Sequence, residues 1–231
     1  MPAFWTQPID IYCERLDPSF WAEPVNALTN LSFILAAIWG WSEARRQAEP
    51  NPLIWGLIGL AGLIGLGSFL FHTFANRWSE YADVVPIWSF VALYVFVAMS
   101  RLGGVRPGRV VAMALAVLAG ITVLYLATMG GGGPDHAPVG PATDPLNGSG
   151  QYLPAVIAFA VFGVVTWRRR HPMRGWIAAA GAVFLVSLIA RTLDMRVCAT
   201  LPLGVHFIWH LLNGLMIGLL LQVLIRSPRA G

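Results

Sequence analysis

Long apolar segments, separated by short connections that carry arginine, dominate this chain of 231 residues. A helix needs roughly 17–25 apolar residues to cross a bilayer. Seven segments meet that requirement: 24–44, 52–75, 80–101, 108–128, 151–167, 174–192 and 202–225. Only 11% of the residues are charged, whereas soluble domains carry about 25%. The sequence therefore predicts an all-α integral membrane protein, with seven transmembrane helices in a single domain over residues 1–231.

The arginines divide unevenly between the two sides of this predicted bundle. Eleven fall on the side of the C-terminus and four on the side of the N-terminus. Cytoplasmic loops carry the excess of basic residues, so we expect the N-terminus outside and the C-terminus in the cytoplasm. Because the basic residues follow membrane topology and form no separate patch, no nucleic-acid partner is expected.

The absence of lysine excludes one class of seven-helix protein. All 15 basic residues are arginine, and a retinal Schiff base requires a lysine amine. A rhodopsin-type photoreceptor is therefore excluded. Transporters built from inverted repeats are disfavoured too, because no repeat and no pair of broken helices is visible.

Three of the five histidines lie inside strongly apolar segments: His72, His206 and His210. Ionisable residues in such segments are candidates for a functional site, because burying polar groups in hydrocarbon is costly. His206 and His210 are four residues apart and share one helix face, which suits two ligands of one metal ion but not the opposite axial positions of a haem. The predicted topology brings all three to the outer ends of their helices. We expect a three-histidine zinc site with an open position; the alternative is three separate structural histidines.

Ser68 and Asp83 fall in the same predicted outer layer as the histidines. Ser68 precedes His72 by four residues, so both face the same way, and its hydroxyl could donate to a developing oxyanion. Asp83 could hold or deprotonate a water at the metal, or support a histidine from behind. The predicted active site therefore faces the outer side of the membrane.

An acidic segment, residues 1–23, precedes the first predicted span on the outer side. Its four carboxylates are Asp10, Glu14, Asp17 and Glu23. Together with backbone carbonyls they would suit Ca²⁺. The alternative is a solvated segment anchored at the membrane interface by aromatic side chains.

Two cysteines and one long connection complete the predicted outer side. Cys13 lies in the acidic segment and Cys198 just before the last span, so an oxidising compartment would allow a disulfide, although two free thiols stay possible. Arg191 and Asp194, close to Cys198, could form a local ion pair. Residues 129–150 are rich in glycine and proline and are expected to form a flexible outer loop, acting as a linker, a gate or a phosphate cradle.

Taken together, the motifs along the chain resemble those of the alkaline ceramidases, seven-helix membrane amidases related to the adiponectin receptors. The matching motifs are Ser68-x-x-x-His72, Asp83, His206-x-x-x-His210, Cys13-Glu14, Glu23 and the pair Asn26 and Asn30. The resemblance runs through nearly the whole chain, and the combination of motifs is more specific than any single pair of histidines.

This resemblance implies a function for the predicted zinc site. It implies that His72, His206 and His210 hold zinc, that Asp83 orients or deprotonates the water, and that Ser68 helps to stabilise the oxyanion. The implied reaction is hydrolysis of ceramide to a sphingoid base and a fatty acid. The implied partners are a lipid amide substrate and the bilayer itself.

The resemblance also implies a calcium site in the N-terminal segment and a disulfide between Cys13 and Cys198. The sequence departs from the family pattern in that segment, because Leu16 stands where the family has an asparagine. Asp10 and Asp17 could substitute as calcium ligands through a changed register.

One alternative function belongs to a different class: a zinc-containing seven-helix receptor or sensor of the adiponectin-receptor type. The short, lysine-free and arginine-rich chain is typical of bacteria, which predicts a multi-pass protein of the bacterial inner membrane. Many bacteria make no sphingolipid, so the substrate could be another lipid amide. The oligomeric state is not predicted by the sequence.

Overall fold

The computed structural model describes residues 4–47, 51–116, 119 and 144–227. Within these ranges the chain is helical and contains no strand, apart from an isolated bridge between Pro8 and Asn76. The helices are η1 (Phe4–Thr6), α1 (Pro24–Thr29), α2 (Leu31–Ala44), α3 (Pro52–Phe74), α4 (Arg77–Arg101), η3 (Ser149–Tyr152), α6 (Leu153–Arg168), α7 (Arg174–Val197) and α8 (His206–Arg226). The predicted all-α class is confirmed for the described residues.

Five helical segments are long and apolar enough to cross a membrane: α3, α4, η3 with α6, α7 and α8. These segments make the chain an integral membrane protein. The first predicted span divides into α1 and α2 at Asn30, and the fourth is described as a helix over Pro107–Ala116. The number of seven spans and the orientation stay predictions. Of the predicted outer loop, residues 129–143 lie outside the described part of the chain.

The connection between α3 and α4 is short and well specified. The chain turns at Ala75, which has a left-handed backbone conformation with φ 43°, and Asn76 then begins α4 with a capping box that includes Ser79. An asparagine is among the preferred residues for such a cap. The end of α3 and the start of α4 are therefore neighbours, which brings the layer of His72 next to that of Asp83.

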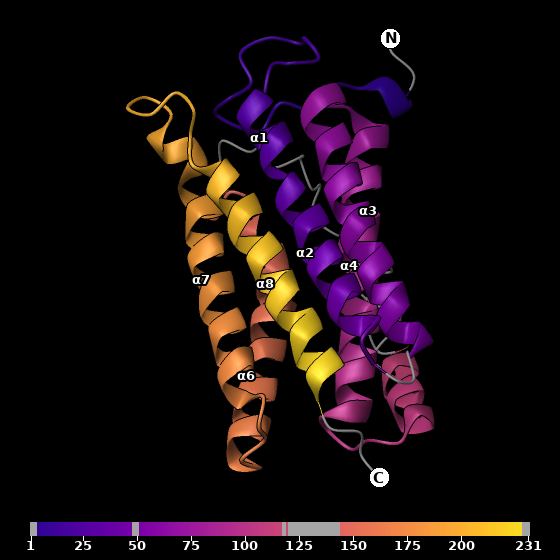
Figure 1. The fold of residues 1–231 in the computed structure, drawn as a ribbon. Helices are drawn as coiled ribbons and strands as arrows, with labels where there is room; N and C mark the ends of the chain where they lie inside the picture. The colour runs from indigo at the N-terminus through magenta and orange to yellow at the C-terminus, as the bar shows by residue number, and fades with distance from the viewer. Residues whose placement is uncertain (1–3, 48–50, 117–118, 120–143, 228–231) are drawn as a thin grey trace.

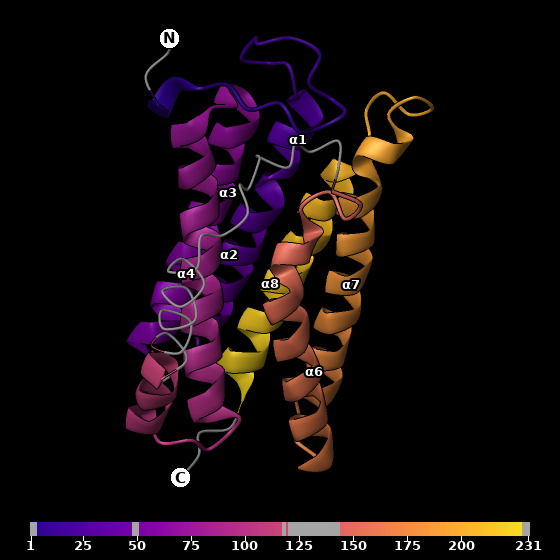
Figure 2. The same ribbon diagram turned by 180° about the vertical axis from the view of Figure 1, so that it is seen from behind.

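The helices stand side by side as one bundle (Figures 1 and 2). The main contacts join α4 to α3, α3 to α2, α2 to α8, α8 to α7, and α7 to α6. Of the five candidate spans α8 is the most buried, and both of its predicted metal ligands lie in its first turns. The outward faces carry exposed large apolar side chains, for example Leu35, Leu63, Ile157, Leu185 and Leu211. Such faces are suited to contact with lipid.

The N-terminal segment covers the end of the bundle at which α3 ends and α8 begins (Figure 1). The Ile9 N–H donates to the Ala75 carbonyl at 2.8 Å, so the segment lies against the turn between α3 and α4. A disulfide joins Cys13 to Cys198, directly after α7. The predicted disulfide is therefore present, and it ties the N-terminal segment to the opposite side of the bundle.

Candidate metal centre

The fold brings three histidines to one point. His72 lies in the last turn of α3, and His206 and His210 lie in the first turns of α8. A ring nitrogen from each lies within 4.8 Å of the others. The residues are only 1–2% exposed. The geometry that the sequence predicted for these three side chains is therefore realised.

The Nδ1 atoms of His72 and His210 form hydrogen bonds with groups around the centre, so the Nε2 atoms face the centre. His72 Nδ1 lies 2.6 Å from Glu23 Oε2, and His210 Nδ1 lies 3.0 Å from Thr29 Oγ1. An ionised carboxylate only accepts, so His72 Nδ1 carries the proton. The Thr29 hydroxyl donates to the Val25 carbonyl at 2.8 Å, so it accepts from His210. In the neutral imidazoles, which are the form that binds a metal, both Nε2 atoms then present lone pairs to each other, 3.1 Å apart.

This donor set fits a zinc ion. Two facing lone pairs repel unless a cation lies between them, and Zn–N bonds of about 2.0–2.1 Å place tetrahedral ligands about 3.3 Å apart. Metal-bound histidines usually donate their other N–H to a carboxylate or another oxygen, as His72 and His210 do. In the described residues, Nδ1 of His206 and Oδ1 of Asp83 are buried without a hydrogen-bond partner.

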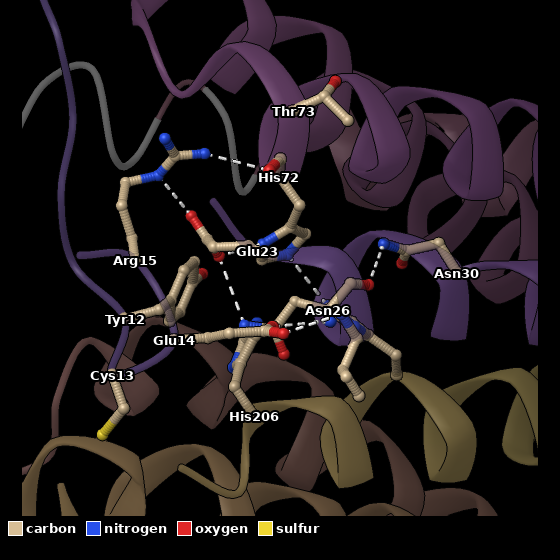
Figure 3. Close-up of polar contacts among 12 residues, drawn as sticks. Tyr12, Cys13, Glu14, Arg15, Glu23, Asn26, Asn30, His72, Thr73 and His206 are labelled. Carbon is tan, nitrogen blue, oxygen red and sulfur yellow. Dashed lines mark hydrogen bonds and ion pairs between the residues drawn. The ribbon is translucent and has the colours of Figure 1, made fainter. Parts of the chain in front are cut away.

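Behind His72, an ion pair orients the ring (Figure 3). Arg15 Nε lies 2.5 Å from Glu23 Oε1, and Arg15 Nη2 donates to the His72 carbonyl at 2.9 Å. That carbonyl lies in the last turn of α3, where intrahelical donors run out. The side chains of Arg15 and Glu23 are only 5% and 3% exposed. One buried guanidinium thus holds both the carboxylate behind His72 and the end of its helix, a role that the sequence did not reveal.

The four carboxylates predicted to bind calcium do not gather around one point. Glu14 accepts two backbone N–H bonds at the start of α1, at 2.7 and 2.8 Å, and its burial raises its pKa although those bonds lower it. Glu23 is paired with Arg15 and His72, while Asp10 and Asp17 are exposed. As folded, these residues do not fit a Ca²⁺ ion, because the Arg15 guanidinium is the cation that pairs with the Glu23 carboxylate.

Ser68 and Asp83 meet where α3 packs against α4. A Cβ at Gly67 would clash with the Ala82 carbonyl, so a glycine lets the two helices approach this closely. Ser68 is buried, and its hydroxyl lies next to the Asp83 carboxylate. Both residues line a cavity of about 320 Å³ together with the three histidines. The two predicted catalytic side chains are therefore beside the candidate metal ligands.

The start of α8 is held by Asp194 from the end of α7. Its Oδ1 accepts the N–H groups of Val205 and His206 at 2.7 and 2.9 Å, and its Oδ2 accepts the N–H of Cys13 at 3.2 Å. Gly204 has φ +67°, and a Cβ there would clash with Asp194 and Cys13. The first N–H groups of a helix need such partners, so Asp194 sets the position of His206.

The ion pair considered for Arg191 and Asp194 does not form. Asp194 is engaged at the start of α8, and Arg191 Nη1 instead donates to the Tyr12 hydroxyl at 3.1 Å. The Tyr12 ring stacks on the His206 ring, with centroids 3.8 Å apart. The expected ion pair is absent although both residues lie on α7, because both carboxylate oxygens of Asp194 accept backbone N–H groups of Cys13, Val205 and His206.

A second, apolar cavity of about 110 Å³ adjoins the histidine cavity. The two share wall residues, namely Phe33, Ile64, Ile87, Tyr152 and Trp209. The apolar cavity reaches Leu220 on α8, about 15 Å along the helix axis from His210 at 1.5 Å per residue. An elongated apolar space therefore leads from the histidines toward the middle of the bundle.

The ceramidase family profile matches residues 12–227. No curated protein matches the chain. The matched range begins at Tyr12 and includes every residue of the histidine centre as well as the disulfide. By this match, the chain belongs to the ceramidase family.

Proposed function

We propose that this protein is a zinc-dependent intramembrane amidase that hydrolyses ceramide or a related N-acyl lipid to an amine and a fatty acid. The observation that carries the proposal is the convergence of three buried histidines with Ser68 and Asp83 in one cavity. Membership of the ceramidase family supports hydrolysis of an amide bond.

Each side chain of the centre has a distinct role in the proposal. His72, His206 and His210 would hold zinc, which supplies Lewis acidity toward an amide carbonyl and toward water. Asp83 accepts a proton from the attacking water and returns it to the amine nitrogen as the C–N bond breaks. Ser68 donates its hydroxyl to the negative charge that develops on the carbonyl oxygen.

The adjoining apolar cavity supports a lipid as the substrate. Its wall is almost entirely aliphatic and aromatic, so an acyl chain would be shielded from water there. An acyl chain in this space would reach the histidine layer with its amide end, because the two cavities share the wall formed by Phe33, Ile64 and Ile87.

We also propose the membrane arrangement of this single domain. Seven spans, with the N-terminus outside, agree with the excess of arginine on the C-terminal side. The histidine centre lies at the end covered by the N-terminal segment (Figure 1), so the active site faces the outer side. A bacterial inner membrane is the proposed location.

The test combines a metal assay with hydrolysis in detergent. Purified protein should hold about one zinc per chain, as expected of a single three-histidine site, and should release fatty acid from an N-acyl lipid in a panel that includes ceramide. His210→Ala should lose the zinc. Asp83→Ala should keep the zinc and lose turnover, whereas Asp17→Asn, an exposed carboxylate, should resemble the wild type.

Zinc retained without hydrolysis of any N-acyl lipid would contradict the amidase and favour the receptor or sensor of the adiponectin-receptor type. Absence of zinc from folded wild-type protein would contradict both functions. The metal content and the turnover of the same preparation therefore separate the two hypotheses.

A further inference from the structure

Arg191 places a buried guanidinium in the wall of the histidine cavity. The residue lies near the end of α7, is 8% exposed and lines the same cavity as Ser68, Asp83 and His206. The hydrolysis described above makes no use of it. A buried charge is costly unless an anion pairs with it, so the placement of this residue requires an explanation.

Three aromatic side chains surround this guanidinium, and only one of them, Tyr12, accepts a hydrogen bond from it. Its Cζ lies 5.5 Å from the ring centroid of Trp209, 5.7 Å from that of Tyr152 and 5.9 Å from that of Tyr12. Such contacts stabilise a cation and orient it. A guanidinium has five N–H donors. Nη1 donates to the Tyr12 hydroxyl, and Nε is buried without a partner in the described residues.

No carboxylate in the described part of the chain forms an ion pair with Arg191. Asp194 caps α8, and Asp144 accepts two backbone N–H groups of its own turn. Asp83 lies beside Ser68 and interacts with Arg191 electrostatically, but it forms no ion pair with it. Glu80, which also lines the cavity, pairs with Arg77. None of the described carboxylates that line the cavity is therefore an ion-pair partner of Arg191.

Arg15, the other arginine that is buried in the described part of the chain, shows how this fold accommodates a structural cation. Arg15 has a carboxylate, Glu23, at 2.5 Å, and its remaining N–H groups reach backbone carbonyls. Arg191 has neither feature: among the described residues, its one side-chain hydrogen bond goes to the Tyr12 hydroxyl, and it borders a cavity. This contrast indicates that the anion for Arg191 comes from a ligand.

The position of Arg191 identifies the side of the substrate that it would meet. Arg191 lines the histidine cavity but not the apolar cavity. Its neighbours in that wall are polar groups of the 144–151 segment: Asn147 and Gln151 line the cavity, and Asn147 Nδ2 donates to the Arg191 carbonyl at 2.9 Å. With the acyl chain in the apolar cavity, the amine fragment of the lipid would lie against Arg191.

We propose that Arg191 binds a carboxylate on the amine fragment, so that this enzyme prefers N-acyl amino acids to neutral N-acyl alcohols. The planar fork of a guanidinium matches a carboxylate with two parallel hydrogen bonds. This inference rests on the proposed function, because it names the substrate class of the same cavity.

Two lipids of nearly equal size isolate the contribution of the carboxylate: N-palmitoylglycine and N-palmitoylethanolamine. They share the acyl chain and the amide and differ by a carboxylate against a hydroxymethyl group. Binding is measured in detergent by thermal stabilisation of the zinc-loaded Asp83→Ala variant, and hydrolysis by kcat/KM of the wild type. Both measurements should favour N-palmitoylglycine by at least about tenfold, the usual range for hydrogen bonds to a charged group.

Three variants test the assignment to Arg191. Arg191→Gln should abolish the preference, so that the two lipids are bound and hydrolysed about equally. Arg191→Lys keeps the charge but loses the planar pair of N–H donors, and it should reduce the preference in part. The matched control is Arg196→Gln, an exposed arginine on the same helix that donates to the Pro145 carbonyl outside the cavity. It should keep the wild-type preference.

An equal preference in wild type and Arg191→Gln would overturn the proposal. If the glutamine variant does not fold, the lysine variant decides, and an unchanged preference in it has the same consequence. A third result would also overturn the proposal: palmitate inhibits the wild type but not Arg191→Gln, while the substrate preference is the same in both. In that case Arg191 would bind the carboxylate of the fatty-acid product.

The two readouts separate this proposal from the proposed function. A preference in binding that depends on Arg191, with no hydrolysis of either lipid, would leave the anion site standing and refute the amidase. Hydrolysis of both lipids at equal kcat/KM, with equal binding, would leave the amidase standing and refute the anion site.

Discussion

Replacing Arg15 by methionine removes the cation behind the candidate metal centre while keeping most of the side-chain volume. The change leaves the Glu23 carboxylate, at 3% side-chain exposure, without its partner at 2.5 Å. Breaking a buried ion pair on one side costs about 3–5 kcal/mol. The His72 carbonyl also loses its donor at 2.9 Å, which adds about 1 kcal/mol or more. We expect a loss of at least about 3 kcal/mol, a large part of the roughly 5–15 kcal/mol that stabilises a folded protein.

The loss is measured as the free energy of unfolding in mixed detergent micelles, with zinc affinity as a second readout. Since Arg15 acts on His72 through Glu23, zinc affinity should fall about 10–100-fold, as for other groups that orient a metal ligand. The double variant Arg15→Met/Glu23→Gln should recover part of the stability, because it removes the stranded charge. The control is Arg46→Met, whose pair with Glu43 has a 74% exposed arginine and should matter by less than about 1 kcal/mol.

A loss below about 1 kcal/mol in Arg15→Met, similar to the control, would refute the reasoning. So would a double variant that is less stable than Arg15→Met by the full cost of a second broken interaction. Either result would mean that water or another group, and not Arg15, compensates the Glu23 charge.

Three further predictions concern the surroundings of the centre. Gly204→Ala should cost at least about 2 kcal/mol, because φ +67° is strained for alanine and its Cβ would clash with Asp194; Gly59→Ala, with open space around it, serves as the control in the same unfolding assay. Adding zinc to metal-free protein should raise Tm, whereas adding calcium should not. A calcium-dependent rise would contradict the conclusion that Arg15, and not Ca²⁺, is the cation beside Glu23. The hydrogen bonds from the N–H groups of Leu146 and Gly148 lower the pKa of Asp144. The stability that this carboxylate contributes is therefore present above the usual carboxyl pKa and is lost as the pH falls through the lowered pKa. Asp144→Asn should flatten the acid part of a profile of Tm against pH, and an unchanged profile would refute this prediction.

The histidine centre could be predicted to a large extent because its signals are local. His206 and His210 share a helix face through their spacing alone, and Ser68 and His72 do so too. The arginine distribution then assigned a depth to each. By contrast, Glu23 was interpreted as a calcium ligand, since a carboxylate in an acidic segment carries no mark that distinguishes a metal ligand from the partner of a distant histidine.

The helical class, the apolar segments and the residues of the candidate zinc site could be identified from the sequence, because hydrophobic length and helical periodicity are properties of contiguous residues. The pairing of the buried polar groups, by contrast, follows from the packing of the helices. This packing set Arg15 against Glu23, directed Asp194 to the start of α8, and left Arg191 facing a cavity. The same side chains also make long-range contacts: Arg15 donates to the His72 carbonyl, 57 residues away, and Asp194 accepts from the N–H of Cys13, 181 residues away. Such contacts depend on how the helices pack and not on any pattern along the chain.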